Sequence, residues 1–124
     1  MIQATELRIG NYILFTNVNG QTEWLQVNVY HMCDIVGNVK NISSDFHASR
    51  YSYIPLTHEI LDKVGGRQKS TNEWKIGRLN IDLTSLSADL WTSQGLWYLS
   101  EVQYVHQLQN LYFTLTGQEL KIEL

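Results

Sequence analysis

Near the end of the chain stands the stretch SEVQYVHQLQNLYFTLTG, residues 100–117, the clearest element of the sequence. Its large apolar residues recur at spacings of three and four, a period typical of an amphipathic helix. They are Val105, Leu108, Leu111, Tyr112 and Leu115. Ser100 with Gln103 fits a capping box at the start, and Gly117 fits a left-handed cap at the end. We therefore expect one amphipathic helix over residues 100–117.

Short strands are expected on both sides of this helix. After it, the apolar residues Leu120, Ile122 and Leu124 alternate with charged residues, which predicts a closing strand. Before it, residues 74–76 and 79–83 have strand patterns, and Gly95 is expected to turn the chain into a strand over residues 96–99. A polar loop is expected over residues 67–72.

The first part of the chain is rich in strand patterns. Residues 11–16 form an aromatic and aliphatic run, and Asn19-Gly20 after it is a strong hairpin signal. Apolar and polar residues then alternate over residues 25–30, which predicts a second strand. Further strands are expected around a turn at Gly37-Asn38 and over residues 51–54. These short strands predict a small antiparallel SH3-like sheet or partial barrel.

A short helix is expected in the middle of the chain. Pro55 ends the strand-rich part, Thr57 is a natural N-cap, and Gly65-Gly66 stops the helix that would span residues 56–64. The length of 124 residues fits one domain. We therefore predict a single α+β domain over residues 1–124. Its halves would be a strand-rich half, residues 1–56, and a helix-strand-helix-strand half, residues 57–124.

The composition excludes several classes of protein. Apolar residues make up 44% and charged residues 17%, which argues against a disordered chain. One cysteine excludes a disulfide within the chain. The net charge of -3 argues against a protein that coats nucleic acid. The start of the chain lacks the features of a signal peptide, so we expect a cytoplasmic protein with no membrane partner.

Patterns for metal binding and catalysis are weak. His31 and Cys33 would share one face of an extended segment, with Asp34 and His47 as conceivable further ligands. No spaced pair of His or Cys residues accompanies them. Cys33 also lacks the surrounding pattern of an activated nucleophile, and the acidic residues are scattered. We predict no metal, no cofactor and no enzymatic activity.

A basic segment is the strongest candidate for a ligand site. From Lys63 to Arg78 there are five basic residues and one acid, so the segment carries +4 and the rest of the chain -7. Gly65-Gly66 can expose backbone N–H groups, and Trp74 can stack on a base. The candidate residues for an anion or nucleotide are Arg67, Lys69, Trp74, Lys75 and Arg78. The alternative is a solvated basic loop that keeps a strand edge from pairing.

The predicted C-terminal helix has an uncharged polar face. Its residues at spacings of three and four are Gln103, His106, Gln107, Asn110 and Thr114. Amide and imidazole groups can be buried at lower cost than ions when they are hydrogen-bonded. We predict that this face forms a contact between identical subunits, most simply in a two-fold dimer. A pocket wall and an ordinary solvent-facing helix are the alternatives.

Three stretches resemble an uncharacterised family of small proteins from gut anaerobes and from their phages and prophages. They are LRIGNY at residues 7–12, IPLTHEIL at residues 54–61 and YVHQLQNLYFTLTGQEL at residues 104–120. The resemblance runs in order along the chain, except for residues 67–99, which depart from it. It implies a phage-linked accessory protein and assigns no catalytic residue.

Two classes of function follow. The first is a non-enzymatic binding protein of a phage or prophage, which would counter a host defence by docking on a host protein or by sequestering a phosphorylated nucleotide signal. The setting comes from the resemblance and not from the residues. The alternative is a nucleic-acid-binding accessory domain built on the N-terminal SH3-like sheet, which is the less favoured of the two. Steep salt dependence of binding to generic DNA or RNA would distinguish the alternative from the first class.

Overall fold

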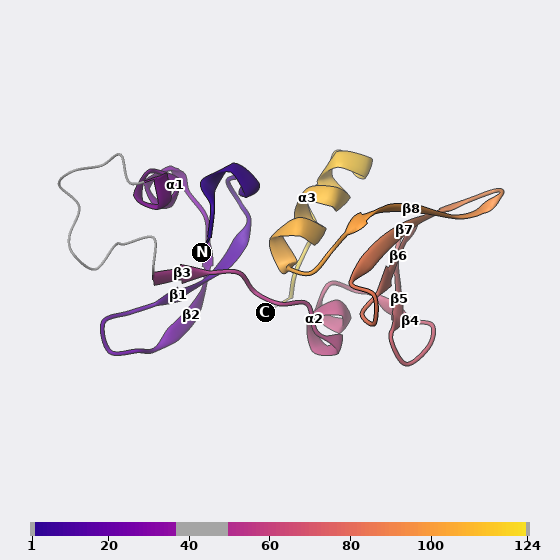
Figure 1. Ribbon diagram of the computed structural model, residues 1–124, viewed down its shortest axis with the longest axis horizontal. Coiled ribbons are helices and arrows are strands. Elements are labelled where there is room, and N and C mark those ends of the chain that lie inside the picture. Colours follow the sequence, from indigo (N-terminus) through magenta and orange to yellow (C-terminus); the bar gives the residue numbers. More distant parts are fainter. Residues whose placement is uncertain (1, 37–49, 124) are drawn as a thin grey trace. The chain divides into compact units, whose positions relative to one another are not determined.

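The computed structural model describes residues 2–36 and 50–123 and shows an α+β protein with two antiparallel sheets (Figure 1). The predicted fold class is thereby confirmed. The chain divides into two compact units. Unit 1 comprises Met1–Ile54 and Val105–Asn110, and unit 2 comprises Pro55–Tyr104 and Leu111–Leu124. Helix α3, Val105–Thr116, contributes its first half to unit 1 and its second half to unit 2.

Unit 1 contains a three-stranded sheet in the order β2-β1-β3. The strands are β1 Tyr12–Thr16, β2 Thr22–Gln26 and β3 Tyr51–Ser52, and a 3-10 turn, η1 Ala4–Glu6, precedes them. The predicted hairpin at Asn19-Gly20 is confirmed, because Gly20 has φ +80 and joins β1 to β2. Buried apolar residues form the core of the unit: Ile2, Leu7, Ile13, Val27, Ile35 and Tyr51. The likeness to an SH3 barrel stays a prediction.

The strand expected over residues 25–30 is wrong in its second half. Residues Val29–Val36 form helix α1, and Val29 and Tyr30 are exposed. The side chains of Asn28 and His31 explain the helix start: Asn28 Oδ1 accepts from the His31 N–H at 3.0 Å, and His31 Nδ1 accepts from the Asn28 N–H at 3.1 Å. This reciprocal pair is a capping box with histidine in the usual place of glutamate. The expected turn at Gly37-Asn38 lies outside the described residues.

Unit 2 contains a five-stranded meander in the order β4-β5-β6-β7-β8. The strands are β4 Arg67–Gln68, β5 Glu73–Ile76, β6 Leu79–Asp82, β7 Ser87–Thr92 and β8 Gly95–Glu101. Strands β5, β6 and β8 lie where the sequence predicted them. Strand β7 was not predicted, and β4 replaces the start of the loop expected over residues 67–72.

Some of the predicted helix starts and stops agree with the structure, and others are wrong. Helix α2, His58–Lys63, is capped as predicted, because Thr57 Oγ1 accepts from the Ile60 N–H at 3.2 Å. The capping box at Ser100 is wrong, because Ser100 belongs to β8 and pairs with Ala88. Gly117, with φ +71, ends α3 as predicted. The closing strand is also wrong: the last described residues form no strand. No helix of the described residues is long and apolar enough to cross a membrane.

The sheet of unit 2 has two faces of opposite character. The inner face carries apolar residues that are at most 5% exposed: Trp74, Ile76, Leu79, Ile81 and Ala88. The outer face, which we define by the alternate residues, carries Arg67, Lys75, Asn80, Asp89 and Tyr98. Because successive side chains of a strand point to opposite faces, the apolar inner face covers the core and leaves polar groups outside.

Candidate functional site

The register of the sheet places a row of functional side chains across the outer face. Arg67 pairs with Lys75, Lys75 with Asn80, Asn80 with Asp89, and Asp89 with Tyr98. Residues that pair directly in antiparallel strands point to the same face and are neighbours. The row therefore begins with two cations, continues with an amide and a carboxylate, and ends with a phenol that is 64% exposed.

A third cation lies against an aromatic ring on this face. Lys69 Nζ is 3.8 Å from the ring centroid of Trp91, within the range of a cation–π interaction. Lys69 directly follows β4, and Trp91 lies on β7, so the contact reaches across the two strands between them. The interaction holds an ammonium group and an indole ring together beside the row of polar side chains.

Two buried polar atoms belong to the same face. Asn80 is 1% exposed, and its Oδ1 has no hydrogen-bond partner among the described residues. The Nε1 of Trp91 is also buried and also lacks a partner among those residues. Buried polar groups in folded proteins are almost always hydrogen-bonded. Both atoms are unsatisfied among the described residues, but protein covers them, so they are not open to a ligand on the outer face.

The structure brings together only part of the predicted basic site. Arg67, Lys69 and Lys75 all lie exposed on the outer face. Trp74 is on the inner face and 4% exposed, so its ring does not share a surface with these cations. Trp74 and Lys75 are consecutive in a strand, and this alternation is the signal that separates them. Trp91 supplies the aromatic ring instead; it was missed because β7 was not predicted.

Arg78 lies in the turn between β5 and β6, at the end of the sheet. Its Nη2 donates to the carbonyl oxygen of Trp91 at 3.1 Å. Arg78 also lines a hollow of about 240 Å³ whose other walls are largely apolar and include Leu79, Leu90 and Leu115. It therefore marks the margin of the outer face and is not a member of the row.

The predicted use of Gly65-Gly66 as a backbone anion site is not supported by the hydrogen bonds. The Gly65 N–H donates to Asp62 O at 3.1 Å, and the Gly66 N–H donates to Leu61 O at 2.9 Å. These are the bonds that end helix α2. A larger hollow nearby, about 530 Å³, is lined by acids and lysines of both signs, among them Glu59, Lys63 and Lys121.

Two residues of the uncharged polar face of α3, His106 and Asn110, make contacts inside unit 1. His106 is fully buried and stacks on Tyr53, with ring centroids 4.5 Å apart. Asn110 Oδ1 accepts from Asn11 Nδ2 at 2.8 Å and from Arg8 Nε at 3.2 Å. The burial inferred from the sequence therefore holds for His106, whereas Asn110 is only partly buried, and the contacts of both residues lie in their own chain.

Gln109 is a buried polar residue that the sequence analysis missed. It is 1% exposed; its Oε1 accepts from the Tyr12 N–H at 2.8 Å, and its Nε2 donates to Gly10 O at 3.3 Å. Gln103 and Thr114 are exposed, and Gln107 is half-buried. The predicted contact between subunits through α3 stays a prediction for these three residues.

Burial also controls the charge of His106. Desolvation lowers the pKa of His106 below its ordinary value, and the negative charge of Glu6 opposes this shift without reversing it. Glu6 Oε2 is 4.0 Å from His106 Nε2 and accepts a hydrogen bond from the Tyr53 hydroxyl at 2.6 Å. At neutral pH the imidazole is therefore uncharged inside unit 1.

The structure does not support the weak metal-binding pattern of His31 and Cys33, which assumed an extended segment. His31 lies on helix α1, so the extended segment that would have aligned it with Cys33 is wrong. His47 lies outside the described residues. Within residues 2–36 and 50–123, no group of three His, Cys, Asp or Glu side chains could hold a metal ion.

Comparison with known proteins finds no matching family model, no matching curated protein and no matching solved structure. No relative therefore assigns a role to the outer face. Its function is inferred from the side chains that the sheet brings together.

Proposed function

We propose that the protein is a non-enzymatic binding protein that holds a phosphorylated small molecule, most simply a nucleotide, on the outer face of the sheet of unit 2. The observation that carries the proposal is the position of three cations on one face of the sheet, one of them against the ring of Trp91. A nucleotide offers the complementary groups: anionic phosphates and a flat base.

Each group on the face has a role in this complex. Arg67, Lys69 and Lys75 contact the phosphates through charge-assisted hydrogen bonds, which contribute about 1.5–3 kcal/mol each, with exposed ones at the low end. A base that stacks on Trp91 takes the place that Lys69 Nζ occupies over the ring, and such stacking contributes about 1–3 kcal/mol.

The acids of the sheet favour a small ligand over a nucleic acid. Asp89 follows Asn80 in the row, and Glu73 pairs with Asp82 on the same face. Glu73 lies on β5, beside Lys75 and opposite Lys69, so carboxylates interrupt the cationic area as well as border it. A long phosphate backbone would run over them and meet like charge, whereas a single nucleotide fits beside them.

The resemblance to phage and prophage proteins supplies a setting for this binding. A phage protein that sequesters a nucleotide signal would block a host defence without any chemistry. We include this role, in the cytoplasm of a bacterial host, in the proposal. Docking on a host protein is the other route by which such a protein could act.

Replacing Arg67 and Lys75 by Ala tests the site. We expect the affinity for a binding nucleotide, found by calorimetry across common mono- and dinucleotides, to fall roughly tenfold or more, since two charge-assisted contacts are removed. The melting temperature should stay the same, because both side chains are exposed. The matched control is Lys63→Ala with Lys121→Ala, which removes the same charge from the mixed hollow.

Equal loss in both double variants would show that only net charge matters and would contradict the proposed site. Binding of an oligonucleotide that is steeply salt-dependent and insensitive to Arg67 and Lys75 would instead favour the alternative, a nucleic-acid-binding sheet in unit 1.

A further inference from the structure

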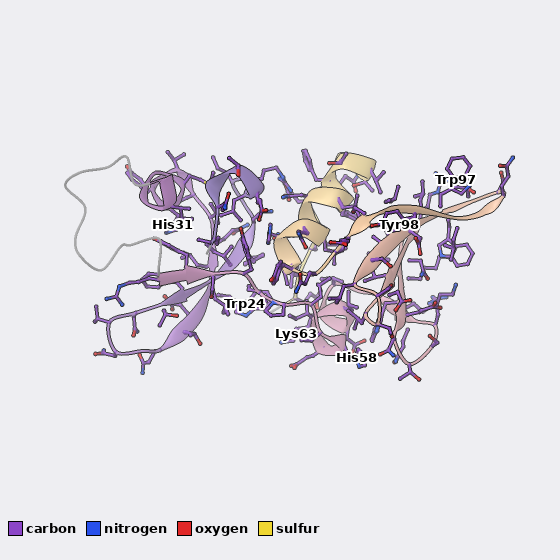
Figure 2. The ribbon with its side chains drawn as sticks, viewed as in Figure 1. Trp24, His31, His58, Lys63, Trp97 and Tyr98 are labelled. Carbon is purple, nitrogen blue, oxygen red and sulfur yellow. The ribbon has the colours of Figure 1, made fainter. Side chains whose placement is uncertain are left out.

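Strand β8 leaves one edge of the five-stranded sheet open. It is the last strand in the order and pairs only with β7 among the described residues. Three consecutive large side chains on it are exposed: Leu96 at 44%, Trp97 at 58% and Tyr98 at 64%. Because neighbouring residues of a strand point to opposite faces, apolar surface is exposed on both sides of the β7–β8 hairpin. Figure 2 shows Trp97 and Tyr98 on this hairpin.

The two edges of the sheet differ in how they are protected. Proteins usually block an exposed edge with a short strand, charged side chains or proline. The β4 edge is two residues long and begins with Arg67. The β8 edge is seven residues long, and residues 92–100 contain no charged residue and no proline. Only the β8 edge is therefore open to another strand.

We propose that β8 pairs with β8 of a second copy of this chain, antiparallel and about a two-fold axis. The bulge between β7 and β8, where Ala88 pairs with Ser100 and Asp89 with Tyr98, leaves Gly95–Tyr98 as the regular part of the edge. A two-fold axis at Trp97 places Trp97 opposite the partner's Trp97 and Leu96 opposite the partner's Tyr98, so that paired residues share one face of the joined sheet. The proposal is independent of the proposed ligand.

The charges on β8 suit a second copy. Glu101 is the only charged residue of the strand. In the antiparallel register the two Glu101 residues are about eight positions apart, or roughly 26 Å at about 3.3 Å per residue. This exceeds the Debye length of about 8–10 Å, so their repulsion is screened. A charged peptide would find no complementary charge along residues 92–100, whereas the strand itself is uncharged and apolar there.

The exposed area sets the expected strength of the pair. A two-fold contact uses Trp97 and Tyr98 twice, and such side chains bury about 150–250 Å² each when fully covered. Since more than half of each is exposed here, the contact would bury several hundred Å² of side chain in addition to backbone. This area lies below the roughly 1,200 Å² at which stable interfaces begin, so we expect a weak, transient pair with a dissociation constant in the micromolar range.

Sedimentation over about 1–300 μM protein, without nucleotide, tests the proposal. The average mass of the wild type should rise with concentration from 14.4 kDa toward twice that value. Trp97→Lys and Leu96→Lys should each remain at the mass of one chain, because a lysine ammonium would be buried in the contact. Tyr30→Lys is the control, since Tyr30 is 80% exposed on α1 and outside the contact. It should associate as the wild type does.

Hydrogen exchange separates strand pairing from a contact through side chains alone. Amides in residues 95–98 should become protected as the wild-type concentration rises, and should not in Trp97→Lys. A wild type that stays monomeric throughout would overturn the proposal. So would a Trp97→Lys dimer of unchanged affinity, or a dimer that Gln107→Glu breaks and Trp97→Lys does not, which would place the contact on α3.

Discussion

His106 shows how one buried residue couples the stability of unit 1 to pH. Its neighbours from other elements are the carboxylate of Glu6 and the ring of Tyr53. Because the folded pKa lies below the unfolded one, the unfolded chain takes up the proton first as the pH falls. The stabilisation by the neutral imidazole is therefore complete above the unfolded pKa and is lost as the pH drops below it.

We expect the free energy of unfolding to fall between about pH 7.5 and 5.5, measured by urea denaturation at each pH. His106→Phe keeps a ring on Tyr53 and should flatten this dependence. His58→Gln changes an exposed histidine of α2 and should keep it. A slope in His106→Phe as steep as that of the wild type would assign the effect to other groups.

At the scale of elements, short sequence patterns correctly predicted the caps and turns that depend only on neighbouring residues. Thr57 at the start of α2 was predicted correctly because its side chain caps the backbone three residues further on. Gly20 in the first hairpin was predicted correctly because the turn needs a positive φ. The start of α3 was misplaced because Ser100 and Gln103 also match a local pattern, while pairing with Ala88 keeps Ser100 in β8. Helix α1 was missed because its cap uses His31, an unusual residue at that position.

The sequence predicted the basic residues of the candidate site but not the aromatic residue beside them. Lysines and arginines close in sequence were recognised as a cluster from the sequence alone. The contact of Lys69 with Trp91 depends on the order of four strands, which no local pattern encodes. Asn80 was not singled out because its burial becomes visible only in the folded sheet.

Asn110→Ala tests the polar bonds that hold α3 in unit 1. The change removes bonds to Asn11, Arg8 and the carbonyl of Glu6, and leaves the amide of Asn11 without one acceptor. We expect a loss of about 1–3 kcal/mol in the free energy of unfolding, measured by denaturant titration. Thr114→Ala, at an exposed position of the same helix, should lose less than about 0.5 kcal/mol. Equal effects would mean that the loss comes from the helix itself.

At the scale of the whole molecule, the division into two units separates the core of unit 1 from the proposed binding face. The outer face lies wholly in unit 2, and the core around Ile13 lies wholly in unit 1. Ile13→Ala should lower the free energy of unfolding by about 2–5 kcal/mol, because it opens a cavity at a fully buried position. Nucleotide affinity, measured by calorimetry well below the melting temperature, should change less than roughly twofold. A larger change would show that unit 1 contributes to the ligand site.

The unequal edges of the sheet in unit 2 also limit how far any assembly can grow. A β-sheet with two open edge strands can add further copies at both edges and polymerise into a fibre. Here β4 is short and begins with Arg67, so a pair joined through β8 presents two blunt outer ends. In the proposed pair, growth of this sheet would therefore end at the first addition, with the exposed aromatic hairpins of both copies in the contact.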